Sequence, residues 1–302
     1  MVYNSIMDCI GHTPCLRLKY GEGAIYAKTE FLNPSGSVKD RITRHIIQNA
    51  EHAGVLRPGM QIAEASSGNT GISLAMAGAA QGYKVTIFMP GNASKERRNL
   101  LKLLGAELVL TPADEYVDGA VKALKKMVSQ RDDIFLLGQF VNEENVAAHY
   151  HGTGREIWAD MDGKVDCFVS GVGSGGTLMG VGSYLKENNP DIRLIAVEPQ
   201  GAAALLGQKA KIHQIEGIGD GFIPQILIPE QIDSIMEIPD SEAIDHAAQL
   251  AKSKGLLVGI SSGANLAAAA LVLEKHSNWR VATILPDRAE RYFSTPLFQG
   301  GA

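Results

Sequence analysis

One lysine lies where its amine could act as a nucleophile. Lys39 follows the turn Asn33–Val38, and apolar residues recur at helical spacing from Ile42 to Ala50. The pattern predicts a helix with Lys39 in its first turn, where unpaired N–H groups and the helix dipole create a positive potential. A lysine in a positive, buried place becomes a nucleophile or a Schiff-base former. A surface lysine with a solvated amine is the alternative, and this stretch alone favours neither.

A first loop that could bind an anion is Ser66–Gly71, with the sequence SSGNTG. It lies between a predicted strand and a predicted helix, and it offers hydroxyls, an amide and backbone N–H groups. Such a loop at a helix N-terminus has the chemistry to hold a carboxylate. A serine-rich N-cap is the simpler explanation. The unbroken run of small polar residues exceeds what a cap needs, so the sequence favours a binding site.

A second loop, Gly171–Thr177, has the sequence GVGSGGT and also precedes a predicted helix. Its backbone could wrap a phosphate, with hydroxyls added by Ser174 and Thr177. Its glycines also fit the GxGxxG dinucleotide fingerprint, and Glu198 lies 198 − 176 = 22 residues beyond its last glycine. Taken alone, the loop fits NAD and a phosphate monoester equally well. The lysine turn and the anion loop that precede it favour the phosphate monoester.

A third loop, Gly259–Gly263, has the sequence GISSG and is also expected after a strand and before a helix. Alone it is best explained as a helix cap. In company with the other loops, it could instead direct a hydroxyl at a ring nitrogen.

Strands and helices alternate along the chain, which predicts an α/β fold with parallel sheets. Near-continuous apolar strands indicate sheets covered on both faces. Strands are expected at 16–18, 24–30, 61–65, 84–89, 107–110, 135–140, 167–170, 193–197, 256–260 and 280–285, and helices, besides the lysine helix, at 5–11, 69–82, 94–104, 118–130, 145–161, 176–187, 241–253 and 264–275.

The bulk composition excludes several classes of protein. The 302 residues suffice for two lobes, and the net charge of −5 argues against nucleic acid or an anionic membrane as a main partner. No apolar run reaches transmembrane length, and residues 1–8 lack the pattern of a signal peptide. Three scattered cysteines predict neither a disulfide framework nor a zinc site, so a reducing cytoplasmic location is expected.

A reactive lysine, a carboxylate loop, a phosphate loop and a hydroxyl together match pyridoxal phosphate chemistry on an amino acid. The chain resembles the cysteine synthase (O-acetylserine sulfhydrylase) family, in the fold-type II group that also includes cystathionine β-synthase. The resemblance covers nearly the whole chain. The motifs that carry it are Asn33–Arg41, Ser66–Gly71, Gly138–Asn142, Gly171–Thr177, Gly217–Pro224, Gly259–Gly263 and Pro286–Thr295.

The resemblance implies a two-domain, three-layer α/β/α fold with mostly parallel sheets, like the β-subunit of tryptophan synthase. It implies a smaller mobile domain at 37–141, carrying the substrate-carboxylate loop, and a larger domain of 1–36 and 142–302, carrying the phosphate loop. The cofactor, pyridoxal 5′-phosphate, is expected in the cleft between them. The resemblance also implies a homodimer.

The resemblance further assigns roles to residues of matching type. Lys39 would form the internal aldimine, Asn69 would bind the cofactor's 3-hydroxyl, and Ser261 would face its pyridine nitrogen. The phosphate cradle would comprise Gly173, Ser174, Gly175, Gly176 and Thr177. The substrate carboxylate would be held by Ser66, Ser67, Thr70 and Gln139. A loop that includes Gly217 and Gly219 would close over the substrate.

The reaction expected from these groups is β-replacement on a β-substituted L-alanine through an aminoacrylate. Lys39, once displaced from the cofactor, would take the α-proton as general base. A neutral serine at the ring nitrogen makes a weaker electron sink and so favours expulsion of the β-substituent. The expected reaction is O-acetyl-L-serine plus sulfide to L-cysteine plus acetate. Outside this chemistry, an NAD-dependent dehydrogenase and a catalytically weak binding protein are the alternatives.

One departure from the family bears on the direction of the reaction. Cysteine synthases commonly have a small apolar residue in the closing loop where this chain has Asp220. A solvated loop aspartate is the simple explanation. If Asp220 faces the site, it would repel hydrosulfide and could act as a base for water or a thiol amino acid. The alternative functions are therefore a sulfide-releasing cysteine β-lyase and a cystathionine β-synthase.

Two departures from the family pattern and one pair of histidines complete the sequence-based interpretation. Asp287 and Arg288 stand where main-type cysteine synthases have two serines, and this pair looks more like the B-type enzymes. Glu143 replaces a usual proline, without a consequence that the sequence explains. His149 and His151 lie on different faces of the predicted helix, so they are expected to be structural, and no metal site is predicted.

Overall fold

A computed structural model describes residues 2–66, 68–209 and 211–299. Contacts between residues divide the chain into two compact units. Unit 1 contains Met1–Ile10 and Asn33–Gly138, and unit 2 contains Gly11–Leu32 and Gln139–Ala302. The chain thus changes unit after residues 10, 32 and 138. The domain limits proposed from the sequence, at 36/37 and 141/142, remain a prediction.

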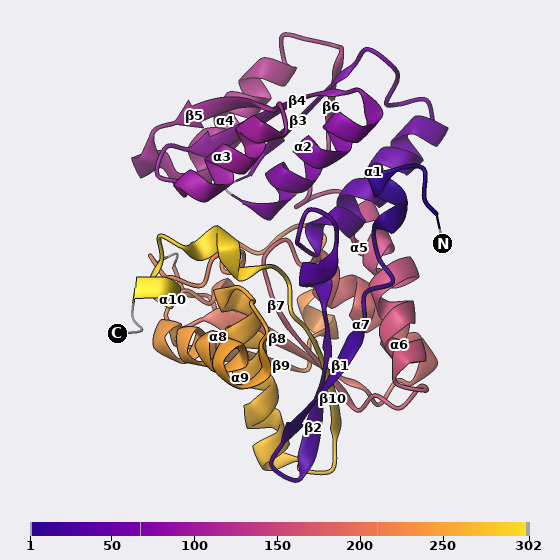
Figure 1. Ribbon diagram of the computed structural model, residues 1–302, viewed down its shortest axis with the longest axis vertical. Helices are drawn as coiled ribbons and strands as arrows, with labels where there is room; N and C mark the ends of the chain where they lie inside the picture. The colour runs from indigo at the N-terminus through magenta and orange to yellow at the C-terminus, as the bar shows by residue number, and fades with distance from the viewer. Residues whose placement is uncertain (1, 67, 210, 300–302) are drawn as a thin grey trace. The chain divides into compact units, whose positions relative to one another are not determined.

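Unit 1 contains a four-stranded parallel sheet in the order β5-β4-β3-β6 (Figure 1). Its strands are β3 (Gln61–Ala65), β4 (Lys84–Pro90), β5 (Glu107–Thr111) and β6 (Ile134–Leu136), and its helices are α1 (Lys39–His52), α2 (Asn69–Gln81), α3 (Lys95–Leu103) and α4 (Tyr116–Val128), with short 3₁₀ turns at Ile6–Cys9 and Ala113–Glu115.

The two faces of this sheet are covered by different helices. Ala63 and Phe88 belong to a buried cluster with Leu124 of α4. The other face meets α2, where a Cβ placed on Gly78 would lie 2.3 Å from Cγ2 of Val85. Because strand side chains alternate between faces, strands buried on both sides read as apolar runs. The predicted three-layer α/β arrangement is confirmed for this unit.

Unit 2 contains a six-stranded sheet in the order β1-β2-β10-β7-β8-β9, parallel except for the β1–β2 hairpin (Figure 1). Its strands are β1 (Cys15–Tyr20), β2 (Gly23–Lys28), β7 (Cys167–Gly171), β8 (Arg193–Pro199), β9 (Ser234–Ile238) and β10 (Arg280–Ile284), and its helices are α5 (Glu144–Ala148), α6 (Arg155–Asp160), α7 (Gly176–Asn188), α8 (Asp240–Lys254), α9 (Ile260–Lys275) and α10 (Pro296–Gln299).

The core of unit 2 forms around α9, whose alanine-rich face packs on the sheet beside α8. A π-helix (His149–Gly154) joins α5 to α6, and 3₁₀ turns lie at Glu30–Leu32, Ala204–Leu206, Pro229–Gln231 and Ala289–Tyr292. On the other face of the sheet, the missing side chain of Gly182 in α7 leaves room for Leu194 of β8.

The sequence-based prediction differs from the structure at several elements, and the expected helix 5–11 is only a 3₁₀ turn at Ile6–Cys9. The expected strand 256–260 does not form, because α9 begins at Ile260 and Val258 makes only an isolated bridge with Arg288. The expected helix 145–161 is interrupted by the π-helix. The expected strand 135–140 ends at Leu136. Strand β9 was missed, since its half-exposed edge residues lack the apolar run of the central strands.

The cysteines carry no cross-link. Cys9, Cys15 and Cys167 are free thiols. Burial is the main cause that raises the pKa of Cys15 to about 11 and that of Cys167 to about 12. Over the residues that the structure describes, no helix has the length and apolarity to cross a bilayer. In the same residues, no cluster of three or more acidic, histidine or cysteine side chains could hold a metal ion.

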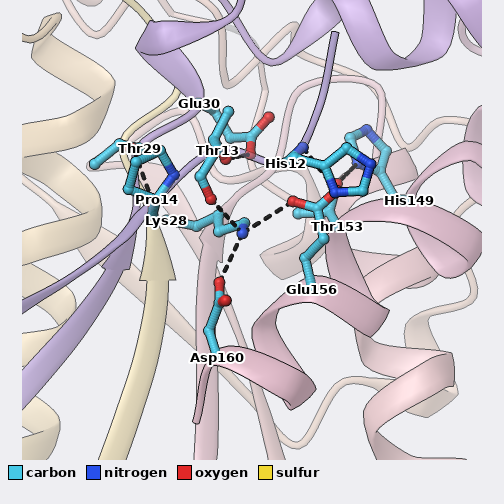
Figure 2. Close-up of polar contacts among 10 residues, drawn as sticks. All are labelled: His12, Thr13, Pro14, Lys28, Thr29, Glu30, His149, Thr153, Glu156 and Asp160. Atoms are coloured by element: carbon cyan, nitrogen blue, oxygen red, sulfur yellow. Dashed lines mark hydrogen bonds and ion pairs between the residues drawn. The ribbon is translucent and has the colours of Figure 1, made fainter. Parts of the chain in front are cut away.

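A buried lysine fastens the sheet of unit 2 to α6 (Figure 2). Lys28, at the end of β2, is 1% exposed, and its Nζ lies 2.7 Å from Asp160 Oδ2 and 2.9 Å from Glu156 Oε2. The same ammonium donates to the carbonyl oxygen of Thr13 at 2.5 Å. All three ammonium protons are therefore used, which is the condition for burying this charge without a large penalty.

We predict that Lys28→Met destabilises the protein by about 3 kcal/mol, because it leaves two carboxylates facing each other. Urea unfolding of the purified protein measures the effect. Arg193→Met is the matched control. Its guanidinium is 59% exposed beside Asp233 at 3.0 Å, so it should change the free energy of unfolding by less than about 1 kcal/mol. Equal effects of the two substitutions would contradict the anchoring role of Lys28.

Candidate active site

The lysine turn in unit 1 is closed by a buried acid. Lys39 is the first residue of α1, as predicted, and its backbone N–H donates to Ser37 Oγ at 3.3 Å. Asp40 is fully buried and folds back on the turn, where its Oδ2 accepts from the backbone N–H of Ser35 at 2.7 Å and its Oδ1 accepts from the Ser35 hydroxyl. These bonds fix the backbone that presents the half-buried Lys39.

The SSGNTG loop forms the N-terminus of α2, as predicted. Ser66 Oγ accepts hydrogen bonds from the backbone N–H groups of Gly68 and Gly71, both at 3.2 Å. Asn69 and Thr70 are the first two residues of the helix, and the N-cap residue, Gly68, has no side chain to cap it. Because its lone pairs already accept from the backbone, the Ser66 hydroxyl is available as a donor to an anion. Ser67 lies outside the described residues.

Two charged residues beside this loop were missed by the sequence analysis. Glu64 in β3 is 4% exposed, and its carboxylate accepts from Ala65 N at 3.1 Å and from Gly138 N at 2.7 Å. It therefore holds the residue that precedes Gln139. Arg97 of α3 is 5% exposed, and its Nε lies 3.5 Å from a Cβ placed on Gly68. A charged residue inside an apolar strand is the signal that could have revealed Glu64.

The glycine loop of unit 2 has no room for side chains at its glycine positions. A Cβ placed on Gly173 would lie 2.5 Å from the carbonyl oxygen of Gly217, and one on Gly176 would lie 1.9 Å from Asn145 Oδ1. Gly175 has a φ of +83° and precedes α7 without a side-chain cap. The loop thus directs bare backbone N–H groups from a helix N-terminus, which is the arrangement that binds phosphate.

Both hydroxyls of this loop contact buried side chains from one segment. Ser174 Oγ accepts from Asn145 Nδ2 at 2.9 Å, and Thr177 Oγ1 lies 3.2 Å from His149 Nε2. The other ring nitrogen of His149 lies 2.9 Å from Thr153 Oγ1 (Figure 2). His149 therefore supports the glycine loop, a role that the sequence did not assign.

The predicted closing loop lies against the glycine loop. The backbone N–H of Gly219 donates to the carbonyl of Val172 at 2.9 Å, and both Gly217 and Gly219 have positive φ. Asp220 is exposed, and its Oδ2 lies 3.7 Å from a Cβ placed on Gly173. The acidic side chain of this loop thus borders the backbone of the glycine loop at Gly173.

Ser261 lies inside a helix rather than in a loop before it, which corrects the prediction for residues 259–263. It is the second residue of α9 and is 3% exposed. One turn later, the Asn265 amide ties α9 to the neighbouring strands, since its Oδ1 accepts from Gly171 N at 2.7 Å and its Nδ2 donates to Ile284 O at 3.0 Å. This amide joins the start of α9 to the first residue of the glycine loop.

The predicted residues thus fall into two groups. Unit 1 carries Lys39, Ser66, Asn69 and Thr70. In unit 2, contacts join the closing loop, the cradle and the helix that contains Ser261. Gln139 belongs to unit 2, and its carbonyl oxygen accepts from Asn145 Nδ2 at 2.7 Å. Each group is ordered by buried polar side chains behind it.

Comparison with known proteins gives consistent matches along nearly the whole chain. A family model described as pyridoxal-phosphate dependent enzyme matches residues 6–287. Cysteine synthase A of Escherichia coli (strain K12) is 48% identical over 301 residues, covering 96% of this chain and 93% of that protein.

Two solved structures are also similar. Cysteine synthase from Entamoeba histolytica is 41% identical with a TM-score of 0.94, covering 99% of this chain and 91% of that one. A hydrogen sulfide-producing enzyme from Fusobacterium nucleatum, solved as an aspartate-to-asparagine mutant with an α-aminoacrylate intermediate, is 37% identical with a TM-score of 0.93. It covers 97% of this chain and 91% of that one.

We predict that Gly173→Ala lowers the affinity for pyridoxal phosphate at least about tenfold, because the new Cβ must displace Gly217 and the closing loop. Fluorescence titration of the cofactor-free protein measures this affinity. Gly91→Ala is the control, since its Cβ would lie 3.3 Å from Thr111 O in the sheet of unit 1. An unchanged affinity in Gly173→Ala would mean that the glycine loop does not hold the phosphate.

Proposed function

The chain belongs to the family of pyridoxal-phosphate dependent enzymes, and we propose that it is a cysteine synthase, which forms L-cysteine and acetate from O-acetyl-L-serine and sulfide. The observation that carries this proposal is the 48% identity to a cysteine synthase over nearly the full length of both chains. The bare backbone of the glycine loop supports it, because a phosphate is the group that fits there.

We propose that Gly173–Thr177 hold the phosphate of the cofactor and that Asn69 and Ser261 contact its ring. When bound, pyridoxal phosphate supplies an electron sink for negative charge at the substrate's α-carbon. Ser261 is a neutral residue at the N-terminal end of α9. A neutral hydroxyl does not stabilise a protonated ring nitrogen as a carboxylate would, which favours prompt loss of a β-substituent over storage of charge.

Ser66, Thr70 and Gln139 are proposed to bind the carboxylate of the amino acid, together with Ser67. Lys39 is proposed as the general base that takes the proton from the α-carbon. Acetate then leaves from the β-carbon with its bonding electrons, hydrosulfide adds to the same carbon, and Lys39 returns a proton to the α-carbon. The loop that binds the carboxylate orients the substrate during these steps, and closure of the loop that includes Gly217 and Gly219 over the substrate excludes water.

We predict that Lys39→Ala lowers the rate of cysteine formation by roughly 10²- to 10⁴-fold, the range for loss of a general base. The assay follows consumption of sulfide and formation of cysteine with O-acetylserine as donor. Lys95→Ala is the matched control, because Lys95 is also the first residue of a helix but is exposed on α3. A wild-type protein that binds the cofactor but makes no cysteine would overturn the proposed function.

A second candidate function is release of sulfide from cysteine. It is favoured by one observation: Asp220, in the closing loop, lies beside Gly173 of the glycine loop. A carboxylate there repels hydrosulfide and could take a proton from water or from a thiol amino acid. The similar hydrogen sulfide-producing enzyme was captured with α-aminoacrylate when one of its aspartates was replaced, which supports testing an aspartate in this role.

If Asp220 directs the reaction, Asp220→Ala should lower sulfide release from cysteine about 10²-fold or more while preserving or increasing sulfide consumption with O-acetylserine. Sulfide is measured in both assays, with and without homocysteine. Asp245→Ala, at an exposed aspartate of α8, should leave both rates unchanged. Equal rates in Asp220→Ala and wild type would make this residue a solvated loop aspartate.

The homodimer and the cytoplasmic location implied by the family resemblance remain predictions. Analytical ultracentrifugation tests the first and fractionation of cells the second.

A further inference from the structure

Asn145 connects two parts of the chain that are proposed to bind different ligands. It is the second residue of α5 and is fully buried. Its Nδ2 donates to the carbonyl oxygen of Gln139 at 2.7 Å and to Ser174 Oγ at 2.9 Å. Gln139 is proposed to bind the carboxylate of the amino acid, and Ser174 the phosphate of the cofactor. One amide group therefore contacts both segments.

The orientation of this amide is fixed by its surroundings. The Gln139 carbonyl can only accept, so the nitrogen of the amide must face it. The Oδ1 atom lies against Gly176, where a Cβ would be only 1.9 Å away, and it has no hydrogen-bond partner among the described residues. A flipped amide would place its oxygen against two oxygen atoms. Asn145 is thus held in one orientation in which both of its N–H groups are used.

This orientation has a consequence for the Ser174 hydroxyl. A serine hydroxyl has one proton to donate and lone pairs to accept. Because Asn145 donates to it, the proton of Ser174 is directed elsewhere, and Ser174 itself is only 4% exposed. The neighbouring N-terminus of α7 attracts anions. A phosphate oxygen at this helix end would receive the proton in a charge-assisted hydrogen bond.

We propose that Asn145 is a positioning residue that makes Ser174 a hydrogen-bond donor to phosphate and fixes the position of Gln139 relative to Ser174. The phosphate-bearing cofactor and the amino-acid substrate then strengthen each other's binding. The substrate side of this proposal rests on the proposed function, whereas the cofactor side rests on the family and on the phosphate site proposed for the glycine loop. Binding that orders one contact of the Asn145 amide favours the other contact, and such coupling acts equally in both directions.

The first experiment compares pyridoxal phosphate with pyridoxal, which lacks the phosphate, as ligands of the cofactor-free protein. In Asn145→Asp, which keeps the shape but removes both donors, the affinity for pyridoxal phosphate should fall about 10- to 100-fold. The affinity for pyridoxal should change less than about twofold. An unchanged affinity for pyridoxal phosphate, or equal losses for both ligands, would overturn the proposal, because a general loss of structure does not discriminate between them.

Two further variants keep the test decisive if Asn145→Asp fails to fold. Ser174→Ala leaves Asn145 in place and should reduce the preference for pyridoxal phosphate over pyridoxal to a similar degree. In the double variant, adding Asn145→Ala to Ser174→Ala should lower the affinity for pyridoxal phosphate little further. Fully additive losses would show that Asn145 does not act through Ser174. Asn188→Ala, at an exposed asparagine near the end of α7, is the control and should bind both ligands like wild type.

The second experiment tests the substrate side in the cofactor-saturated enzyme. Asn145→Asp should raise KM for O-acetylserine about tenfold with a smaller change in kcat, because Gln139 loses its register. A fall in kcat with unchanged KM would contradict that part. If wild type makes no cysteine but Asn145→Asp still loses discrimination, only the proposed function fails. If wild type makes cysteine and discrimination is unaltered in Asn145→Asp, only this inference fails.

Discussion

The absence of a Cβ at Gly173 and Gly176 is the constraint on which the packing around the glycine loop depends. At Gly173 and Gly176 the space that a Cβ would fill is taken by Gly217 O and by Asn145. The loop can therefore be contacted closely from two sides, by the closing loop and by α5, and no side chain of Gly175 caps the N-terminus of α7 that it precedes. Any side chain there would separate these layers before it reached a ligand, since close-packed interiors transmit such displacements.

Buried polar side chains next to these loops hold the loop backbones in place by directional hydrogen bonds, which apolar packing does not provide. Asn145 and Asn265 each use their amides between segments far apart in the sequence, and Glu64 does so in unit 1. A buried amide or carboxylate costs free energy unless its partners lie in the right geometry. The same cost makes each contact specific, because a displaced loop would leave a buried polar group without a partner.

The parts of the site predicted from sequence are those defined by local chemistry. The Lys39 turn, the SSGNTG loop and the GVGSGGT loop are runs of small polar residues between a strand and a helix, and the structure has them at the N-termini of α1, α2 and α7. Asn145 and Asn265 could not be found in this way, since Asn265 contacts Gly171 across 94 residues. The loop 259–263 was misjudged because the apolar run before it resembles a strand, whereas α9 already begins at Ile260.

The same logic explains how related enzymes can differ in chemistry while sharing a fold. Asp220 is exposed on a loop whose backbone is bonded to Val172 and turns at glycines with positive φ. A charge at this position changes the electrostatic potential at the glycine loop, because its Oδ2 lies 3.7 Å from a Cβ placed on Gly173. Identity over nearly the full chain therefore argues for the cofactor and the class of reaction. Whether the enzyme consumes or releases sulfide is the property that we propose Asp220 to influence.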